Sequence, residues 1–87
     1  MTDRIDILPS AQRELAALPV KDRKQVDKRI RGLGRAPRPP GGKALQGQKG
    51  LFRLRVRRYR VIYQIRDDVL VVIVVKVGHR RDVYRSL

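Results

Sequence analysis

Cysteine is absent from this 87-residue chain, and acidic residues are scarce. The lack of cysteine excludes disulfide bonds, thiolate zinc sites and cysteine nucleophiles. Only 8 acidic residues stand against 22 lysines and arginines, and the acids form no evident carboxylate cluster. A two-metal nuclease needs such a cluster. We therefore expect neither a metal nor another cofactor.

Long apolar runs are also missing. The longest run, residues 69–75, is far shorter than the roughly 20 residues that span a bilayer. The N-terminal residues include Asp3, Arg4 and Asp6 instead of an apolar segment, so we expect no signal peptide. Together with the lack of cysteine, these features favour a cytoplasmic protein with no membrane partner.

The chain has a large positive charge that is unevenly spread. The net charge is +14, and such a charge attracts polyanions. Residues 1–35 carry 9 basic and 5 acidic residues, or +4, whereas residues 36–87 carry 13 and 3, or +10. Arginines outnumber lysines by 16 to 6, which favours bidentate contacts to phosphate. The functional surface is therefore expected in the second half.

The first part of the chain predicts one short strand and two helices. Residues 4–8 alternate weakly between polar and apolar side chains, as a strand does. Ser10 is a suitable N-cap for a helix, and Pro19 separates that helix from a second one over residues 20–35. The apolar positions that recur at helical spacing are Ala11, Leu15 and Leu18 in the first helix, and Val26, Ile30 and Leu33 in the second.

Residues 35–49 are rich in proline and glycine and predict a loop. The segment Gly41-Gly42-Lys43 does not match a Walker phosphate-binding loop, which needs GxxxxGK[ST]. Neither side of the loop is large enough to fold well alone, so we expect a single domain over residues 1–87.

Three strands are predicted after the loop. Apolar and basic residues alternate between Phe52 and Arg57, and a similar alternation runs from Tyr59 to Arg66. Asp67-Asp68 predicts a tight turn. Residues 69–77 are nearly all apolar and β-branched, which is typical of a central strand covered on both faces, and Gly78 is expected to end it.

The predicted order is β-α-α-β-β-β, which indicates an α+β fold. We expect an N-terminal strand, a helical hairpin, and then a three-strand antiparallel meander in one twisted sheet. The helical pair would cover one face. The opposite face would be partly open and lined by arginines.

Arg53, Arg55 and Arg60 are the candidate centre of the site. Alternate residues of a strand point the same way, so Arg53 and Arg55 share a face. Residues 51–66 contain no acid that could neutralise them. A row of guanidinium groups of this kind suits a chain of phosphates.

These segments resemble the RelE/ParE superfamily of bacterial toxins, and its RelE branch more closely. The resemblance covers essentially the whole chain and rests on Leu45-Gln46-Gly47, Phe52-Arg53-Leu54-Arg55, the run from Tyr59 to Ile65, and the run from Val77 to Tyr84. It implies a type II toxin that cuts messenger RNA in the ribosomal A site. It also implies inhibition by an acidic, RelB-like antitoxin.

The resemblance also implies site residues. The family has two basic residues, typically lysines, at Arg53 and Arg55, arginines at Arg60 and Arg80, and a tyrosine at Tyr84. The change of both lysines to arginine leaves the general base open, because the arginine pKa exceeds about 12. The tail between Arg80 and Tyr84 is shorter than the family pattern.

RNA can be cut without metal when its own 2′-hydroxyl attacks the adjacent phosphorus. Arg60 and Arg80 would hold that phosphate, while Arg53 and Arg55 would stabilise the added charge. His79, the only histidine, either supplies an acid or base or merely ends a strand. Tyr84 either stacks on a base or anchors the tail. Further RNA contacts are expected from Lys43, Lys49, Arg57, Arg58 and Arg81, although Arg57 and Arg58 could instead form a solvated turn.

Two other functions fit the same fold. A ParE-like toxin would poison DNA gyrase and cut no RNA, and a nucleic-acid-binding module would have no catalytic activity. The basic positions and Tyr84 favour the ribonuclease.

Overall fold

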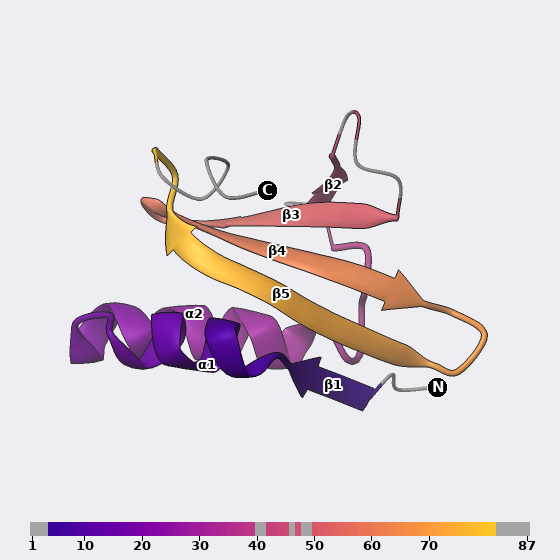
Figure 1. Cartoon of the computed structure of the whole chain (residues 1–87), viewed down its shortest axis with the longest axis horizontal. Helices are drawn as coiled ribbons and strands as arrows, with labels where there is room; N and C mark the ends of the chain where they lie inside the picture. The colour runs from indigo at the N-terminus through magenta and orange to yellow at the C-terminus, as the bar shows by residue number, and fades with distance from the viewer. Residues whose placement is uncertain (1–3, 40–41, 46, 48–49, 82–87) are drawn as a thin grey trace.

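The computed structural model describes residues 4–39, 42–45, 47 and 50–81 (Figure 1). They form two helices and five strands, with bounds β1 Arg4–Ile7, α1 Pro9–Ala16, α2 Val20–Gly32, β2 Gly42–Ala44, β3 Leu51–Val56, β4 Tyr59–Arg66 and β5 Val71–His79. No helix among these residues is long and apolar enough to cross a membrane.

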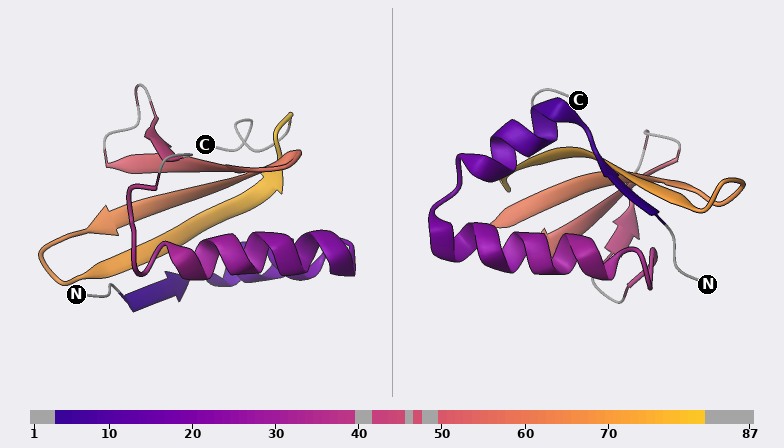
Figure 2. Two further views of the ribbon diagram at one scale, coloured as in Figure 1. Left: turned by 180° about the vertical axis from the view of Figure 1, so that it is seen from behind. Right: turned by 90° about the horizontal axis from the view of Figure 1, so that it is seen from below.

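The five strands form one mixed sheet in the order β1-β5-β4-β3-β2. The pairs β2–β3, β3–β4 and β4–β5 are antiparallel, whereas β1 runs parallel to β5. The sheet is visibly twisted, and α1 and α2 form a layer on one of its faces (Figure 2). The predicted α+β fold, with a helical hairpin and an antiparallel meander, is confirmed.

The core lies between the helical layer and one face of the sheet. The expected apolar stripes supply the helical side of it: Ala11, Val26, Ile30 and Leu33 are buried, and Leu15 and Leu18 pack beside them. Strand alternation supplies the other side, through Leu54, Val56, Tyr59, Val61 and Tyr63 of β3 and β4 and Val72, Val74 and Val77 of β5. Both tyrosines of β4, Tyr59 and Tyr63, therefore lie in the core.

The helix ends differ from the prediction. Helix α1 begins at Pro9, and Leu8, not Ser10, occupies its N-cap without a side-chain hydrogen bond. Proline is favourable at the first helical position, because that N–H has no partner within the helix. Helix α2 ends at Gly32 instead of residue 35, yet Leu33, its C-cap, still reaches the core.

The predicted loop over residues 35–49 contains a strand, β2, which pairs with the edge of β3. Strand β5 also differs, because Val69 and Leu70 belong to the turn and the strand continues past Gly78 to His79. The turn at Asp67-Asp68 is confirmed. Strand β5 is flanked on both edges by other strands, but Ile73 and Val75 are only half-buried on the face away from the helices.

Helix α1 closes the part of the β5 edge that β1 leaves uncovered. Strand β1 pairs with β5 only over Val71 to Val74. Beyond that point, Glu14 accepts a hydrogen bond from the Val77 backbone N–H at 3.1 Å and one from Lys76 Nζ at 2.7 Å. A free strand edge can pair with other chains, so this carboxylate protects the edge.

Candidate nucleic-acid interface

The three arginines that centre the predicted site lie on the sheet face away from the helices. In the β3–β4 register, Arg55 pairs with Arg60 and Arg53 pairs with Ile62. Lys43 of β2 pairs with Arg53. Directly paired residues share a face, so Lys43, Arg53, Arg55 and Arg60 form one basic row across three strands. Like charges placed directly opposite each other destabilise a sheet.

Nothing acidic in the described part of the chain neutralises this row. The ion pairs among the described residues involve other cations, namely Arg4, Arg31, Arg38, Arg66 and Lys76. Ile62 is fully buried within the same face and provides an apolar floor between strands. Charges act more strongly beside such a floor than in open water. The row is therefore suited to an anion from outside.

Arg60 carries a buried hydrogen-bond donor within the row. Its Nε is buried and has no hydrogen-bond partner among the described residues. Its Nη1 donates only one long hydrogen bond, 3.5 Å, to the Tyr59 carbonyl oxygen. A buried donor without an acceptor costs free energy, and more when it is charged. A phosphate bound at the accessible part of this guanidinium would compensate its charge.

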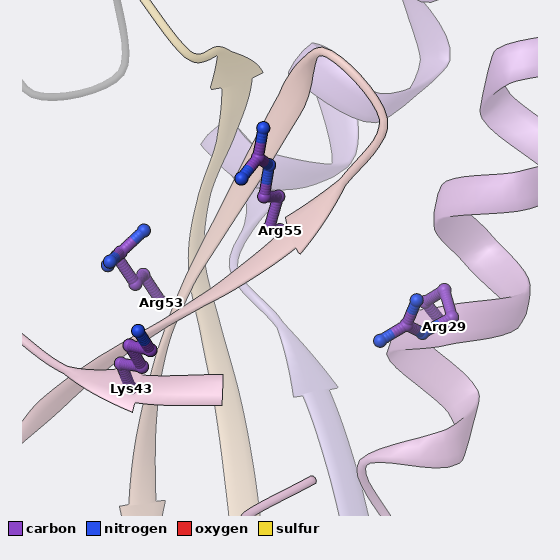
Figure 3. A pocket seen from close by; sticks show the side chains of 4 residues that line it. All are labelled: Arg29, Lys43, Arg53 and Arg55. Carbon is purple, nitrogen blue, oxygen red and sulfur yellow. The ribbon is translucent and has the colours of Figure 1, made fainter. Parts of the chain in front are cut away.

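A cleft of about 320 Å³ lies at the outer side of β3. Its described lining consists of Arg29, Lys43, Arg53 and Arg55, which come from α2, β2 and β3 (Figure 3). Arg29 is the one member that the sequence prediction missed. It lies in a helix with many charged residues, and no local pattern distinguishes it from the others.

The backbone brings Arg80 next to the β3–β4 turn. The Arg80 N–H donates to the Arg58 carbonyl oxygen at 2.9 Å, and Arg57, Arg58, Arg80 and Arg81 are all exposed. Arg57 adopts a left-handed backbone conformation, with φ 55°, which is unfavourable for a residue with a side chain. Arg57 and Arg58 do form the predicted turn, and their role as RNA contacts stays a prediction.

His79 lies on the other face of the sheet from the arginine row. It pairs with Tyr59, and the two rings meet edge to face with centroids 6.2 Å apart. Its Nδ1 accepts a hydrogen bond from the Arg81 backbone N–H at 3.2 Å. His79 thus contacts Tyr59 and the Arg81 backbone at the end of β5. Its ring is not on the face that carries the arginine row.

Tyr59 in turn connects this end of the sheet to α2. Its hydroxyl donates to Asp22 at 2.7 Å. That hydrogen bond, followed by burial, raises the pKa of Tyr59 above its ordinary value of 10.0. Tyr59 therefore stays neutral at physiological pH and acts as a structural hydrogen-bond donor.

Two predicted site residues, Lys49 and Tyr84, lie outside the described residues. Among the residues that are described, no group of three or more histidine, cysteine, aspartate or glutamate side chains is placed to hold a metal ion. The described site is made of basic side chains, so the chemistry available to it is electrostatic binding and orientation of an anion.

Comparison with known proteins identifies the family. The model of a family described as the ParE toxin of the type II toxin–antitoxin system parDE matches residues 5–84. The chain belongs to this toxin family. A comparison with curated protein sequences gave no match.

Solved structures assign this ParE-family chain to the RelE-like part of the RelE/ParE superfamily. A chain of the toxin–antitoxin complex RelBE2 from Mycobacterium tuberculosis is 29% identical to this chain, with a TM-score of 0.80. The match covers 92% of this chain and 100% of that chain. The RelBE toxin–antitoxin complex of E. coli is 29% identical, with a TM-score of 0.78 and coverage of 88% and 95%. The RelE–RelB complex from Pyrococcus horikoshii OT3 is 27% identical, with a TM-score of 0.80 and coverage of 92% and 97%.

Proposed function

We propose that this toxin is a ribosome-dependent endoribonuclease that cuts messenger RNA without a metal ion. The observation that carries the proposal is the pairing of Arg55 with Arg60 across β3 and β4, together with the buried, unpartnered Nε of Arg60. An arrangement of like charges that costs stability is understandable when function requires it. A scissile phosphate would supply the missing negative charge.

The cut proceeds through the RNA's own 2′-hydroxyl. Its oxygen attacks the adjacent phosphorus and loses its proton to a base, while the bond from phosphorus to the 5′-oxygen breaks and that oxygen gains a proton. The products are a 2′,3′-cyclic phosphate and a 5′-hydroxyl. Arg60, with Arg80, holds the phosphate, and Arg53 and Arg55 stabilise the charge that builds up on its oxygens.

Arginine retains its proton, so the row itself supplies no base. In this proposal the arginines therefore position the phosphate and neutralise its charge, and the two proton transfers depend on groups outside the row. Tyr84 stacks on an unpaired base, and Lys43, Lys49, Arg57, Arg58 and Arg81 bind flanking phosphates.

The proposed partner in the resting state is an acidic, RelB-like antitoxin. The similar structures include the RelBE2 and RelBE toxin–antitoxin complexes and a RelE–RelB complex. The net charge of +14 and the exposed basic face would attract an acidic chain. The ribosome and its message would be the partners of the free toxin, in the cytoplasm.

The test is induced expression followed by primer extension on a translated message. Wild type should give cuts in phase with codons, and Arg60→Ala should abolish them. Arg66→Ala is the matched control, because Arg66 lies on the same face of β4 but pairs with Asp68. Uncut message during growth arrest by the wild type would exclude the ribonuclease function.

Inhibition of DNA gyrase is the second candidate, because the matching family model is the ParE one. It predicts growth arrest with intact message and inhibition of supercoiling by purified protein. Direct supercoiling assays with the wild type and Arg60→Ala would separate the two functions, since the ribonuclease leaves gyrase active.

A further inference from the structure

We propose that the cleft between α2 and β3 is a second phosphate site, which holds the RNA backbone beside the scissile phosphate, with Arg29 as its far wall. This inference rests on the proposed function. It adds a residue of α2 to a site whose other proposed residues, where the structure describes them, all lie outside the helices, and it defines a path for the substrate strand.

The composition of the cleft is the first argument. All four side chains of its described lining are cations, and the described ion pairs include none of them. The contrast within α2 is direct, because Arg31 pairs with Asp27 at 2.9 Å, whereas Arg29 is directed to the cleft (Figure 3). Four cations around one cleft, with no ion-pair partner in the part of the chain that the structure describes, predict an anionic ligand.

Continuity with the arginine row is the second argument. Arg53 and Arg55 line the cleft and also lie on the face that carries Arg60. Strand β2 pairs with β3 only as far as Leu54, so none of the described residues pairs with the outer edge of β3 at Arg55. A strand bound at Arg60 can therefore pass Arg55 and continue over this edge toward Arg29.

The lining also favours RNA over a segment of the antitoxin. An amphipathic helix binds through an apolar groove, and no apolar side chain lines the described cleft. A phosphodiester needs only charge and hydrogen-bond donors, which guanidinium groups provide in a fork. The ligand class that fits is thus a phosphate of the single-stranded substrate.

The test compares Arg29→Gln with Lys28→Gln. Both remove one positive charge from α2, and glutamine, arginine and lysine have similar helix propensities. Lys28 is exposed and is not part of the cleft lining. The probes are RNA strands with a 2′-deoxy sugar at the cut position, which bind without being cut, and they range from a dinucleotide to longer strands.

For the longer strands, Arg29→Gln should weaken binding roughly three- to tenfold at low salt. The negative slope of log K against log salt should also become shallower, by about 0.7. Dinucleotide binding should not change, and Lys28→Gln should have little effect on either probe. Equal effects of the two variants, or no binding of the longer strand by wild type, would overturn the proposal.

Two further outcomes separate this proposal from its alternatives. If Arg29→Gln weakens binding of an acidic antitoxin peptide but not of RNA, the cleft is an antitoxin site and the proposal is wrong. If it impairs cutting on ribosomes yet leaves strand binding intact, the ligand is ribosomal RNA and the proposal is again wrong.

If the cleft binds RNA as expected while the wild type leaves messages uncut, the ribonuclease function fails and the cleft assignment stands.

Discussion

The hydroxyl of Tyr63 lies only 2.7 Å from the position that a Cβ would occupy on Gly42. This hydroxyl belongs to a fully buried side chain and donates to the Pro37 carbonyl oxygen at 2.9 Å, so it cannot move aside easily. Gly42 begins β2 and precedes Lys43, a member of the basic row. The absence of a side chain here is what lets β2 approach the sheet.

Gly42→Ala should therefore lower the free energy of unfolding by about 1–3 kcal/mol, because the added methyl group overpacks the contact. Tyr63→Phe removes the oxygen and, on its own, should cost about 1 kcal/mol through the lost hydrogen bond. In chemical denaturation, the double variant should be more stable than the sum of the single changes predicts. Strictly additive changes would show that the hydroxyl does not restrict Gly42.

The pH dependence of stability should report the hydrogen bond between Tyr59 and Asp22. The pKa of Tyr59 is raised, chiefly by this hydrogen bond, so the folded state holds the phenol proton more tightly than the unfolded chain does. Its contribution to stability is complete below the ordinary pKa of 10.0 and is lost as pH rises through the higher folded pKa.

Asp22→Ala should lower the Tyr59 pKa toward its ordinary value and weaken this alkaline loss of stability. An ultraviolet titration of tyrosinate measures the change, and Tyr59→Phe identifies which step belongs to Tyr59. That control is needed because burial also raises the pKa of Tyr63. An unchanged titration in Asp22→Ala would mean that Asp22 is not the acceptor in solution.

The edge closure by Glu14 predicts a local effect on β5. Glu14→Ala removes the acceptor for both the Val77 N–H and Lys76 Nζ, and should destabilise the fold by about 2 kcal/mol. Glu14→Gln retains an acceptor for the N–H and should cost about 1 kcal/mol. Hydrogen exchange at the Val77 amide should accelerate in Glu14→Ala. If the Val77 amide exchanges equally fast in the wild type and in Glu14→Ala, then Glu14 does not close the β5 edge in solution.

His79→Gln should retain most of the proposed cutting activity, because the His79 ring lies against Tyr59 on the other face from Arg60. The measurement is primer extension beside Arg60→Ala, which should show none. A loss as complete as that of Arg60→Ala, in a variant that still folds, would show instead that His79 transfers a proton.

Regular patterns made most of the fold predictable. Alternation around Phe52 and Tyr59 located β3 and β4, and their register then put Arg53, Arg55 and Arg60 on one face. Strand β2 could not be predicted in this way, because Gly42-Lys43-Ala44 has neither alternation nor β-branched residues. It is a strand because the edge of β3 provides hydrogen-bonding partners.

The remaining differences have equally local causes. The sequence predicts too early a start for β5 because Val69 and Leu70 continue its apolar run, yet Leu70 takes a left-handed conformation, φ 54°, in the turn. Arg29 was missed because its role depends on packing. Only the position of α2 beside β3 brings it to Lys43 and Arg53, which lie far from it in the sequence.

The parallel pairing of β1 with β5 has a consequence for synthesis of the chain. Strand β1 emerges first from the ribosome, but its partner residues, Val71 to Val74, emerge only after both helices and four strands have been made. Closing so long a loop makes the pairing a late event in folding. The nascent toxin thus has an incomplete sheet until most of its sequence has been translated.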